Sequence, residues 1–349
     1  MTVSHLYKRF NLEAGFFARF GRFVNAVNDI SFSIGKNESY GLVGESGCGK
    51  TTTARMLVRM YEADSGEIIF NDGGAQIPVK DLKKEALREY REKVRYVFQD
   101  PARSLNPRMS VYEVLVSGCR KPLRRKGVKE NELRQKAAII LEEVGLSAAD
   151  LEKRPSEFSG GQRQRISIAR ALLMEPEVLI CDEVVSALDV SIQGQILNLL
   201  LDIRKKRNMS FLFIAHDLKV ACYFCDRIGV MYKGELMEEA PAADLYKDAL
   251  HPYTKLLFSS AAGIEGEESP RINAEEKRVR GFSRINAEPQ PNPKGEGSPL
   301  DLRIGENIKS PEGSCSFAPR CPLATERCLC EHPELKEISA GHSIRCFKC

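Results

Sequence analysis

The chain has 349 residues, of which 42% are hydrophobic and 29% are charged; this length suggests about two folding units, and this composition excludes a wholly disordered chain. The 52 basic and 48 acidic side chains leave a net charge of +4, too small to indicate nucleic-acid binding, so we expect no nucleic-acid partner. The apolar runs, such as Ile196–Ile203, are shorter than the roughly 20 residues of a membrane helix, and the opening MTVSHLYKRF lacks the apolar stretch of a signal peptide, so we expect a cytoplasmic protein.

Short apolar runs alternate with helix-length segments through the first 250 residues. Such alternation indicates a mostly parallel sheet covered by helices, with ligands at the carboxyl ends of the strands. From about 105 to 174 the apolar spacing is helical, which predicts a helical insertion in this α/β domain of residues 1–250. The expected strands lie at 39–43, 94–98, 178–181 and 211–215, followed by a hairpin at 227–232 and 235–239.

The remaining 99 residues (349 − 250) differ in composition from the first 250. We predict a flexible linker over 251–314, because most of it is rich in Gly, Pro, Glu, Lys and Asn; it contains RINAE twice, at 271–275 and 284–288. A small cysteine-rich extension follows at 315–349. In a cytosolic chain, clustered cysteines indicate metal or redox chemistry before disulfides.

The segment GESGCGKT at 44–51 matches the phosphate-binding pattern G-x-x-x-x-G-K-[ST], between an expected strand and an expected helix. Glycines allow backbone amides to turn toward an anion, and the start of the helix adds partial positive charge. Lys50 would contact the β- and γ-phosphates, and Thr51 would bind Mg²⁺. The predicted nucleotide-binding residues of this loop are Gly44, Glu45, Ser46, Gly47, Cys48, Gly49, Lys50, Thr51 and Thr52.

A second half of the site is expected where the strand VLICDE ends. A carboxylate at the end of a buried strand suits Mg²⁺, which prefers hard oxygen ligands, and we assign this role to Asp182. The neighbouring Glu183 is placed to polarise an attacking water.

The segment EFSGGQRQ at 157–164 resembles the signature motif of ABC-type ATPases. The order of motifs is also that of the family: phosphate loop, Gln99, signature, acidic strand end, SALD at 186–189 and His216. The resemblance implies a P-loop NTPase (RecA-like) core with an antiparallel β subdomain and a helical insertion that carries the signature.

The resemblance also implies roles for single residues. Two such domains pair head to tail, so that each ATP lies between one phosphate loop and the partner's signature, here Ser159, Gly160, Gly161 and Gln162. Glu183, His216 and Gln99 would be catalytic; Gln99 would also touch Mg²⁺, and Asp189 would align the two halves. An aromatic side chain near the N-terminus stacks on adenine in the family; Phe10 is our assignment and Phe23 the alternative, with core packing open for both.

Three longer segments narrow the resemblance to ATP-binding subunits of dipeptide/oligopeptide (and nickel) importers: 99–111, 182–200 and 251–260. It implies an ATPase paired with a second ATPase, a paralogue in preference to a second copy. It also implies two separate permease subunits, indirectly a solute-binding protein, and a peripheral position on the inner face of the cell membrane. The alternative is a soluble ATP-driven assembly or regulatory factor with a redox-sensing cysteine module.

The tail also resembles the C-terminal extension of that subfamily. The resemblance implies a 4Fe–4S cluster on Cys315, Cys321, Cys328 and Cys346. Four soft thiolates suit Zn²⁺ as well, and free thiols remain a third reading. Cys330 and Cys349 could replace a neighbour, whereas Cys222 and Cys225 are expected to pack on one helix face.

Overall fold

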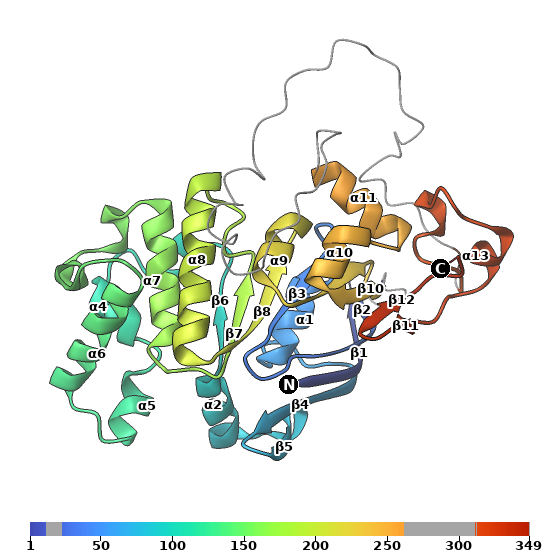
Figure 1. Cartoon of the computed structure of the whole chain (residues 1–349). Helices are drawn as coiled ribbons and strands as arrows, with labels where there is room; N and C mark the ends of the chain where they lie inside the picture. Colours follow the sequence, from blue (N-terminus) through green and yellow to red (C-terminus); the bar gives the residue numbers. More distant parts are fainter. Residues whose placement is uncertain (12–22, 262–310, 312, 349) are drawn as a thin grey trace, which may run out of the picture.

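The computed structural model describes residues 1–11, 23–261, 311 and 313–348 of the chain. Two sheets form its framework, a four-stranded sheet of order β2-β1-β4-β5 and an eight-stranded sheet of order β11-β12-β10-β9-β3-β8-β7-β6 (Figure 1). The four-stranded sheet is antiparallel and consists of β1 (Thr2–Asn11), β2 (Phe23–Ser33), β4 (Ser65–Asp72) and β5 (Ala75–Pro78).

The eight-stranded sheet has a parallel centre and an antiparallel edge. Its parallel strands are β3 (Ser39–Val43), β6 (Val94–Val97), β7 (Val178–Asp182), β8 (Ser210–Ala215) and β9 (Arg227–Tyr232). The antiparallel strands β10 (Glu235–Pro241), β12 (His342–Ile344) and β11 (Lys336–Ser339) extend it beyond β9. The expected strands and hairpin are therefore confirmed, whereas the strands of the smaller sheet were not located from sequence.

Side chains along a strand alternate between the two faces of the sheet, and in the parallel centre both faces are covered by other elements. On one face, Leu42, Ile180 and Ile214 pack with α1 (Lys50–Leu57) and the four-stranded sheet. On the other face, Phe211 and Phe213 pack toward the helices α7 (Gly160–Leu172), α8 (Val190–Arg207) and α9 (Leu218–Phe224). The sheet is thus the middle of three layers, which explains why its strands are continuously apolar.

The helical insertion is confirmed, since 105–174 contains no strand and lies beside the sheet as a separate group of helices (Figure 1). Its helices are α4 (Val111–Val116), α5 (Arg120–Arg125), α6 (Glu130–Glu143) and α7 (Gly160–Leu172). The other helices are α2 (Lys84–Lys93), α3 (Pro101–Ser104), α8 (Val190–Arg207), α9 (Leu218–Phe224), α10 (Ala242–Asp248), α11 (Pro252–Ala261) and α13 (Glu326–Cys330). No helix of the described residues combines the length and the apolar character needed to cross a membrane.

The segment predicted as a linker starts with helix α11, which packs against α9 and β10. Residues 262–310 and 312, including both copies of RINAE, lie outside the described residues. Beyond them the chain returns to the sheet, where β12 pairs with β10. The buried His342 side chain contacts the buried Glu238 carboxylate at 2.8 Å, and Glu238 also accepts the N–H of His251 at 3.0 Å. The cysteine-rich extension is therefore joined to the main sheet.

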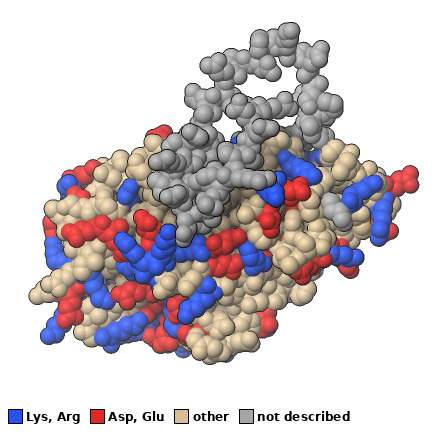
Figure 2. All heavy atoms as spheres, in the orientation of Figure 1, with Lys and Arg blue, Asp and Glu red and all other residues tan. Residues whose placement is uncertain are grey.

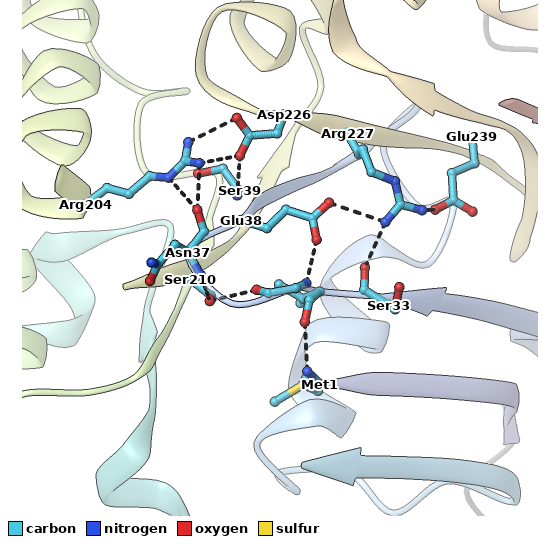
Figure 3. Close-up of polar contacts among 12 residues, drawn as sticks. Met1, Ser33, Asn37, Glu38, Ser39, Arg204, Ser210, Asp226, Arg227 and Glu239 are labelled. Carbon is cyan, nitrogen blue, oxygen red and sulfur yellow. Dashed lines mark hydrogen bonds and ion pairs between the residues drawn. The ribbon is translucent and has the colours of Figure 1, made fainter. Parts of the chain in front are cut away.

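A polar network holds the end of the sheet at which β3 begins (Figure 3). The Arg204 guanidinium donates to the Asn37 carbonyl at 2.7 Å and pairs with Asp226 at 2.5 Å. The Asp226 carboxylate accepts the N–H of Ser39 at 2.9 Å. Helix α8 and the residue before β9 thus fix the first residue of β3. The glycine-rich loop follows the opposite end of this strand.

Charged side chains of both signs are interspersed on the face drawn in Figure 2. In the basic stretch that includes α5, Arg124 pairs with Glu130 and Lys126 pairs with Glu92. Such exposed pairs contribute little stability each, about 0–1 kcal/mol. They do neutralise much of the positive charge that the sequence concentrates there.

Candidate functional site

The glycine-rich loop joins the carboxyl end of β3 to the first residue of α1. Gly49 precedes the helix with a φ of 108°, and a Cβ there would lie 2.1 Å from the Ala26 carbonyl oxygen. A Cβ on Gly44 would lie 2.1 Å from the carbonyl oxygen of Met231. Both positions therefore require glycine, because neighbouring backbone leaves no room for a side chain. The loop is held close to β2 and β9.

Lys50 turns back into the loop from the start of α1. Its side chain is 3% exposed, and its Nζ donates to the carbonyl oxygens of Gly44 at 2.7 Å and Glu45 at 2.9 Å. Burial raises the pKa of the nearby Cys48 thiol, which favours its neutral form. The one cation inside the described part of the loop is therefore positioned by main-chain oxygens, at the helix start where an anion would bind.

Thr51 and Asp182 meet although they lie on different elements. The Thr51 hydroxyl donates to the Asp182 carboxylate at 2.9 Å, and the Tyr96 hydroxyl donates to its other oxygen at 2.5 Å. Asp182 is 2% exposed at the end of β7. Burial and the Asp182 charge raise the pKa of Tyr96, so the phenol stays protonated and donates. This arrangement offers hard oxygen atoms next to the phosphate loop, which fits Mg²⁺.

Glu183 follows Asp182 but has different contacts. Its backbone has a φ of 49°, and its N–H donates to the Ile214 carbonyl of β8 at 3.1 Å. Its carboxylate accepts a hydrogen bond from the Gln99 side-chain amide at 2.7 Å. Glu183 and His216 line the same small cavity, and His216 follows the end of β8. The structure thus brings together the residues that the sequence predicted as catalytic.

The signature residues form the start of α7. Ser159 caps this helix by accepting the N–H of Gln162 at 3.3 Å, while the Gln162 side chain accepts the N–H of Ser159 at 2.9 Å. A Cβ on Gly161 would lie 2.6 Å from a methyl group of Ile192 in α8, so this helix contact needs glycine. Ser159 is exposed, and so is Asp189, which occupies the N-cap position of α8 without a capping side-chain hydrogen bond.

The aromatic candidates for adenine lie at the end of the β1–β2 pair. The Phe10 ring packs edge-on against Tyr61 with a centroid distance of 5.4 Å. Phe23 is 55% exposed, and the Arg9 guanidinium lies 4.7 Å from the centroid of its ring. Neither contact involves the phosphate loop, so the stacking role of Phe10 stays a prediction.

A basic groove opens beside Asp182 and Gln99. It has a volume of about 730 Å³, and a second hollow of about 720 Å³ shares Ser117 and Gly118 with it and continues to α5. The groove lies between the sheet and the helical insertion and is lined by Gln99, one of the residues predicted as catalytic. Five arginines line it: Arg55, Arg91, Arg95, Arg103 and Arg170.

The cysteines of the extension have mixed exposure. Cys315 and Cys328 are buried, Cys321 and Cys346 are half-buried, and Cys330 is exposed. Burial raises the pKa of Cys315 and, with the neighbouring thiols, that of Cys321 to about 11. Thiols are the donor type that soft metal groups prefer. Within the described residues, however, no three His, Cys, Asp or Glu side chains are arranged to hold a metal ion, and Cys349 lies outside them.

The C-x-x-C pair behaves as packing residues, with Cys222 in α9 and Cys225 directly after its last residue. Cys225 is 6% exposed in the core, and burial raises the pKa of Cys222 to about 12. Both thiols are therefore held in the neutral form, which is the less nucleophilic one.

Two residues near the site were not predicted from sequence. Tyr96 donates a hydrogen bond to Asp182. Its place in an expected strand, three residues before Gln99, is the only indication in the sequence that it could lie near the site. Arg320, from the C-terminal extension, forms a two-pronged ion pair with Glu45 of the phosphate loop at 2.8 and 2.9 Å. No local pattern predicts this second contact, because its partners are 275 positions apart.

Comparison with known proteins gives matches along most of the chain. The family model described as ABC transporter matches residues 27–186, and the model described as oligopeptide/dipeptide transporter, C-terminal region, matches 237–288 and 285–328. The oligopeptide transport ATP-binding protein OppF of Bacillus subtilis (strain 168) is 47% identical over 260 residues, 74% of this chain and 81% of OppF. AppF, with the same description and source, is 39% identical over 348 residues, 99% of this chain and 96% of AppF.

Solved structures agree in fold. The structure of cbiO1 from Clostridium perfringens, described as part of the ABC transporter complex cbiONQ, has a TM-score of 0.60 and 26% identity, covering 71% of this chain and 90% of cbiO1. The dimeric structure of MJ0796, a bacterial ABC transporter cassette, has a TM-score of 0.59 and 25% identity, covering 69% of this chain and 98% of MJ0796.

Proposed function

The chain belongs to the family of ATP-binding subunits of oligopeptide ABC transporters, and from this membership we propose how its residues couple ATP hydrolysis to peptide import. The observation that carries the proposal is the meeting of the phosphate loop with the acidic end of β7, through Thr51 and Asp182 at 2.9 Å. The same family membership favours an importer subunit over a soluble assembly or regulatory factor.

The loop residues Gly44–Thr52 bind the phosphates of ATP through main-chain amides, and Lys50 supplies the positive charge. Thr51, Asp182 and Gln99 would hold Mg²⁺, which would supply positive charge to neutralise the phosphates. Asp182 suits this role because its carboxylate is already oriented by Thr51 and Tyr96.

Hydrolysis uses the neighbouring carboxylate. Glu183 accepts a proton from the attacking water, and Gln99 orients both that carboxylate and the water. His216, which lines the same cavity as Glu183, donates a hydrogen bond to the γ-phosphate. The different environments of the two adjacent acids support this division of roles. Asp182 is buried and accepts two side-chain hydrogen bonds, whereas Glu183 lines a cavity.

A second ABC ATPase completes the site, and we favour a paralogue over a second copy. The start of α7 presents the exposed Ser159 and the main-chain amides of Gly160 and Gly161 to the partner's ATP, while Asp189 aligns the two subunits. The dimeric arrangement named for the MJ0796 cassette is in line with this pairing.

The basic groove of each ATPase receives a segment of a permease subunit. The ATPase then lies on the inner face of the cell membrane. Through the permeases it acts indirectly with a solute-binding protein. Five arginines favour a docking segment with acidic side chains or a helix carboxyl end. Because Gln99 lines the groove and also bonds Glu183, movement of this segment reaches the catalytic carboxylate.

Co-expression with candidate permeases and a paralogous ATPase tests this function. We expect the complex to co-purify and, in proteoliposomes, to take up labelled oligopeptide only with ATP. Arg103→Glu should lower co-purification about tenfold, because it reverses a charge in the groove. The matched control Lys205→Glu, on the exposed side of α8, should not. Wild-type chain that neither hydrolyses ATP nor binds permeases would contradict the function.

We also propose that Cys315, Cys321, Cys328 and Cys346 hold a 4Fe–4S cluster, with Zn²⁺ as the alternative. Four thiolates are the usual ligands of such clusters, and the group would cross-link the turns of the extension. Protein purified without oxygen should contain about four iron and four sulfide per chain if the cluster forms. Cys328→Ser should lose them, whereas the control Cys330→Ser should keep them. About one zinc per chain, or no metal, would contradict the cluster.

A further inference from the structure

The C-terminal extension reaches the phosphate loop through one buried arginine. Arg320 is 5% exposed and is the last residue of a short helical turn of the extension, Ala318–Arg320. Its two terminal nitrogens pair with the two carboxylate oxygens of Glu45 at 2.9 and 2.8 Å. Glu45 is the second residue of the loop and is itself partly exposed, with a side-chain exposure of 28%. The pair therefore lies at the border of the nucleotide site.

The guanidinium is held by an aromatic cluster. Tyr232 at the end of β9, Tyr253 in α11 and Phe317 in the extension have mutual centroid distances of 4.7, 5.3 and 5.3 Å. Arg320 lies 5.5 Å from the centroid of Tyr232 and 5.8 Å from that of Phe317. Such stacking fixes the plane of a guanidinium and suits a two-pronged pair with a carboxylate.

The polar groups of Glu45 are held from several sides. Its N–H donates to the Tyr253 hydroxyl at 3.0 Å, and its carbonyl accepts from Lys50 at 2.9 Å and from the N–H of Cys48 at 3.2 Å. Its carboxylate is bound by Arg320. The first turn of the loop is thus fixed by the C-terminal part of the chain as well as by the loop itself.

A carboxylate on a loop that binds polyphosphate raises an electrostatic problem. Left unpaired, the Glu45 charge would repel the phosphates and would attract Lys50 away from them. The bidentate Arg320 neutralises the carboxylate and engages both of its oxygens. The positive charge of Lys50 can then act on the phosphates of the nucleotide.

We propose that Arg320 is a positioning residue of the nucleotide site, through which the C-terminal extension neutralises Glu45 and sets the affinity for ATP. This inference rests on the proposed ATPase function and adds to it a part of the chain outside the α/β domain. If Arg320 only anchored the extension to the α/β domain, a variant that also lacks the Glu45 charge would not recover ATP affinity.

The test measures ATP affinity and steady-state hydrolysis of the full chain. Arg320→Ala should raise Kd and KM for ATP about tenfold and change kcat less, because the unpaired Glu45 opposes binding more than chemistry. Adding Glu45→Gln to Arg320→Ala should bring Kd back to within about threefold of wild type, because the repelling charge is gone. Arg320→Lys should give a Kd between those of the wild type and Arg320→Ala, because lysine keeps the positive charge but cannot form the two-pronged pair.

The control Lys336→Ala removes an exposed charge of the same extension and should bind ATP like the wild type. A wild-type Kd for Arg320→Ala would overturn the inference. A loss that Glu45→Gln does not reverse would also overturn it, since that is the behaviour of an anchor. Failure of the wild-type chain to bind ATP would instead contradict the proposed function, so the two failures are distinguishable.

Discussion

Lys50→Met is expected to weaken ATP binding by at least about 100-fold and to abolish measurable hydrolysis. Methionine keeps the length of the side chain and removes only the ammonium. This ammonium donates hydrogen bonds to the carbonyls of Gly44 and Glu45, at 2.7 and 2.9 Å. Both bonds lie within the loop that would surround the phosphates, so the loop's own main chain positions the charge that ATP needs.

The size of this effect follows from the bonds that are lost. A hydrogen bond to a charged group contributes about 1.5–3 kcal/mol, and a factor of ten in affinity corresponds to about 1.4 kcal/mol. Titration with ATP and a phosphate-release assay give the two values, and circular dichroism checks the fold. Lys36→Met, an exposed lysine before β3, is the control. Unchanged affinity in Lys50→Met would mean that the loop does not bind phosphate.

The parts of the site that lie close together in sequence could be predicted from it. The phosphate loop is a run of consecutive residues in which glycine at Gly44 and Gly49 is required by backbone contacts, so spacing and residue type identify it. Buried parallel strands such as β7 and β8 are apolar except at one end, Asp182 in β7 and Ser210 in β8, so their apolar runs could be located in the sequence.

Other features depended on contacts between distant segments. The strands of the smaller sheet were not located, because β1 and β2 mix polar and apolar residues and their register contains irregular steps. The sequence also did not predict that the cysteine-rich extension adds β11 and β12 to the main sheet, or that Arg320 pairs with Glu45. Such pairings are determined by tertiary packing, and a single sequence carries no local pattern for them.

Glu183→Gln is expected to lower kcat by about 10²–10⁴-fold while ATP affinity stays within about threefold of wild type. Glutamine preserves the shape of the side chain and can still accept a hydrogen bond from Gln99, which lies 2.7 Å from the carboxylate. It cannot accept the proton of the attacking water. The change therefore removes the chemical step and leaves the phosphate loop and the metal-binding acid intact.

The measurement separates the two adjacent acids. Asp182→Asn should weaken Mg²⁺-dependent ATP binding as well as turnover, because Asp182 is buried between Thr51 and Tyr96 and is assigned to the metal. Glu183→Gln should instead trap bound ATP and hold the ATPase pair closed, which size-exclusion chromatography with ATP would detect. Glu177→Gln, at an exposed carboxylate just before β7, is the control for loss of negative charge. Hydrolysis by Glu183→Gln at the wild-type rate would exclude this residue as the base, and His216, which lines the same cavity, would be the next candidate.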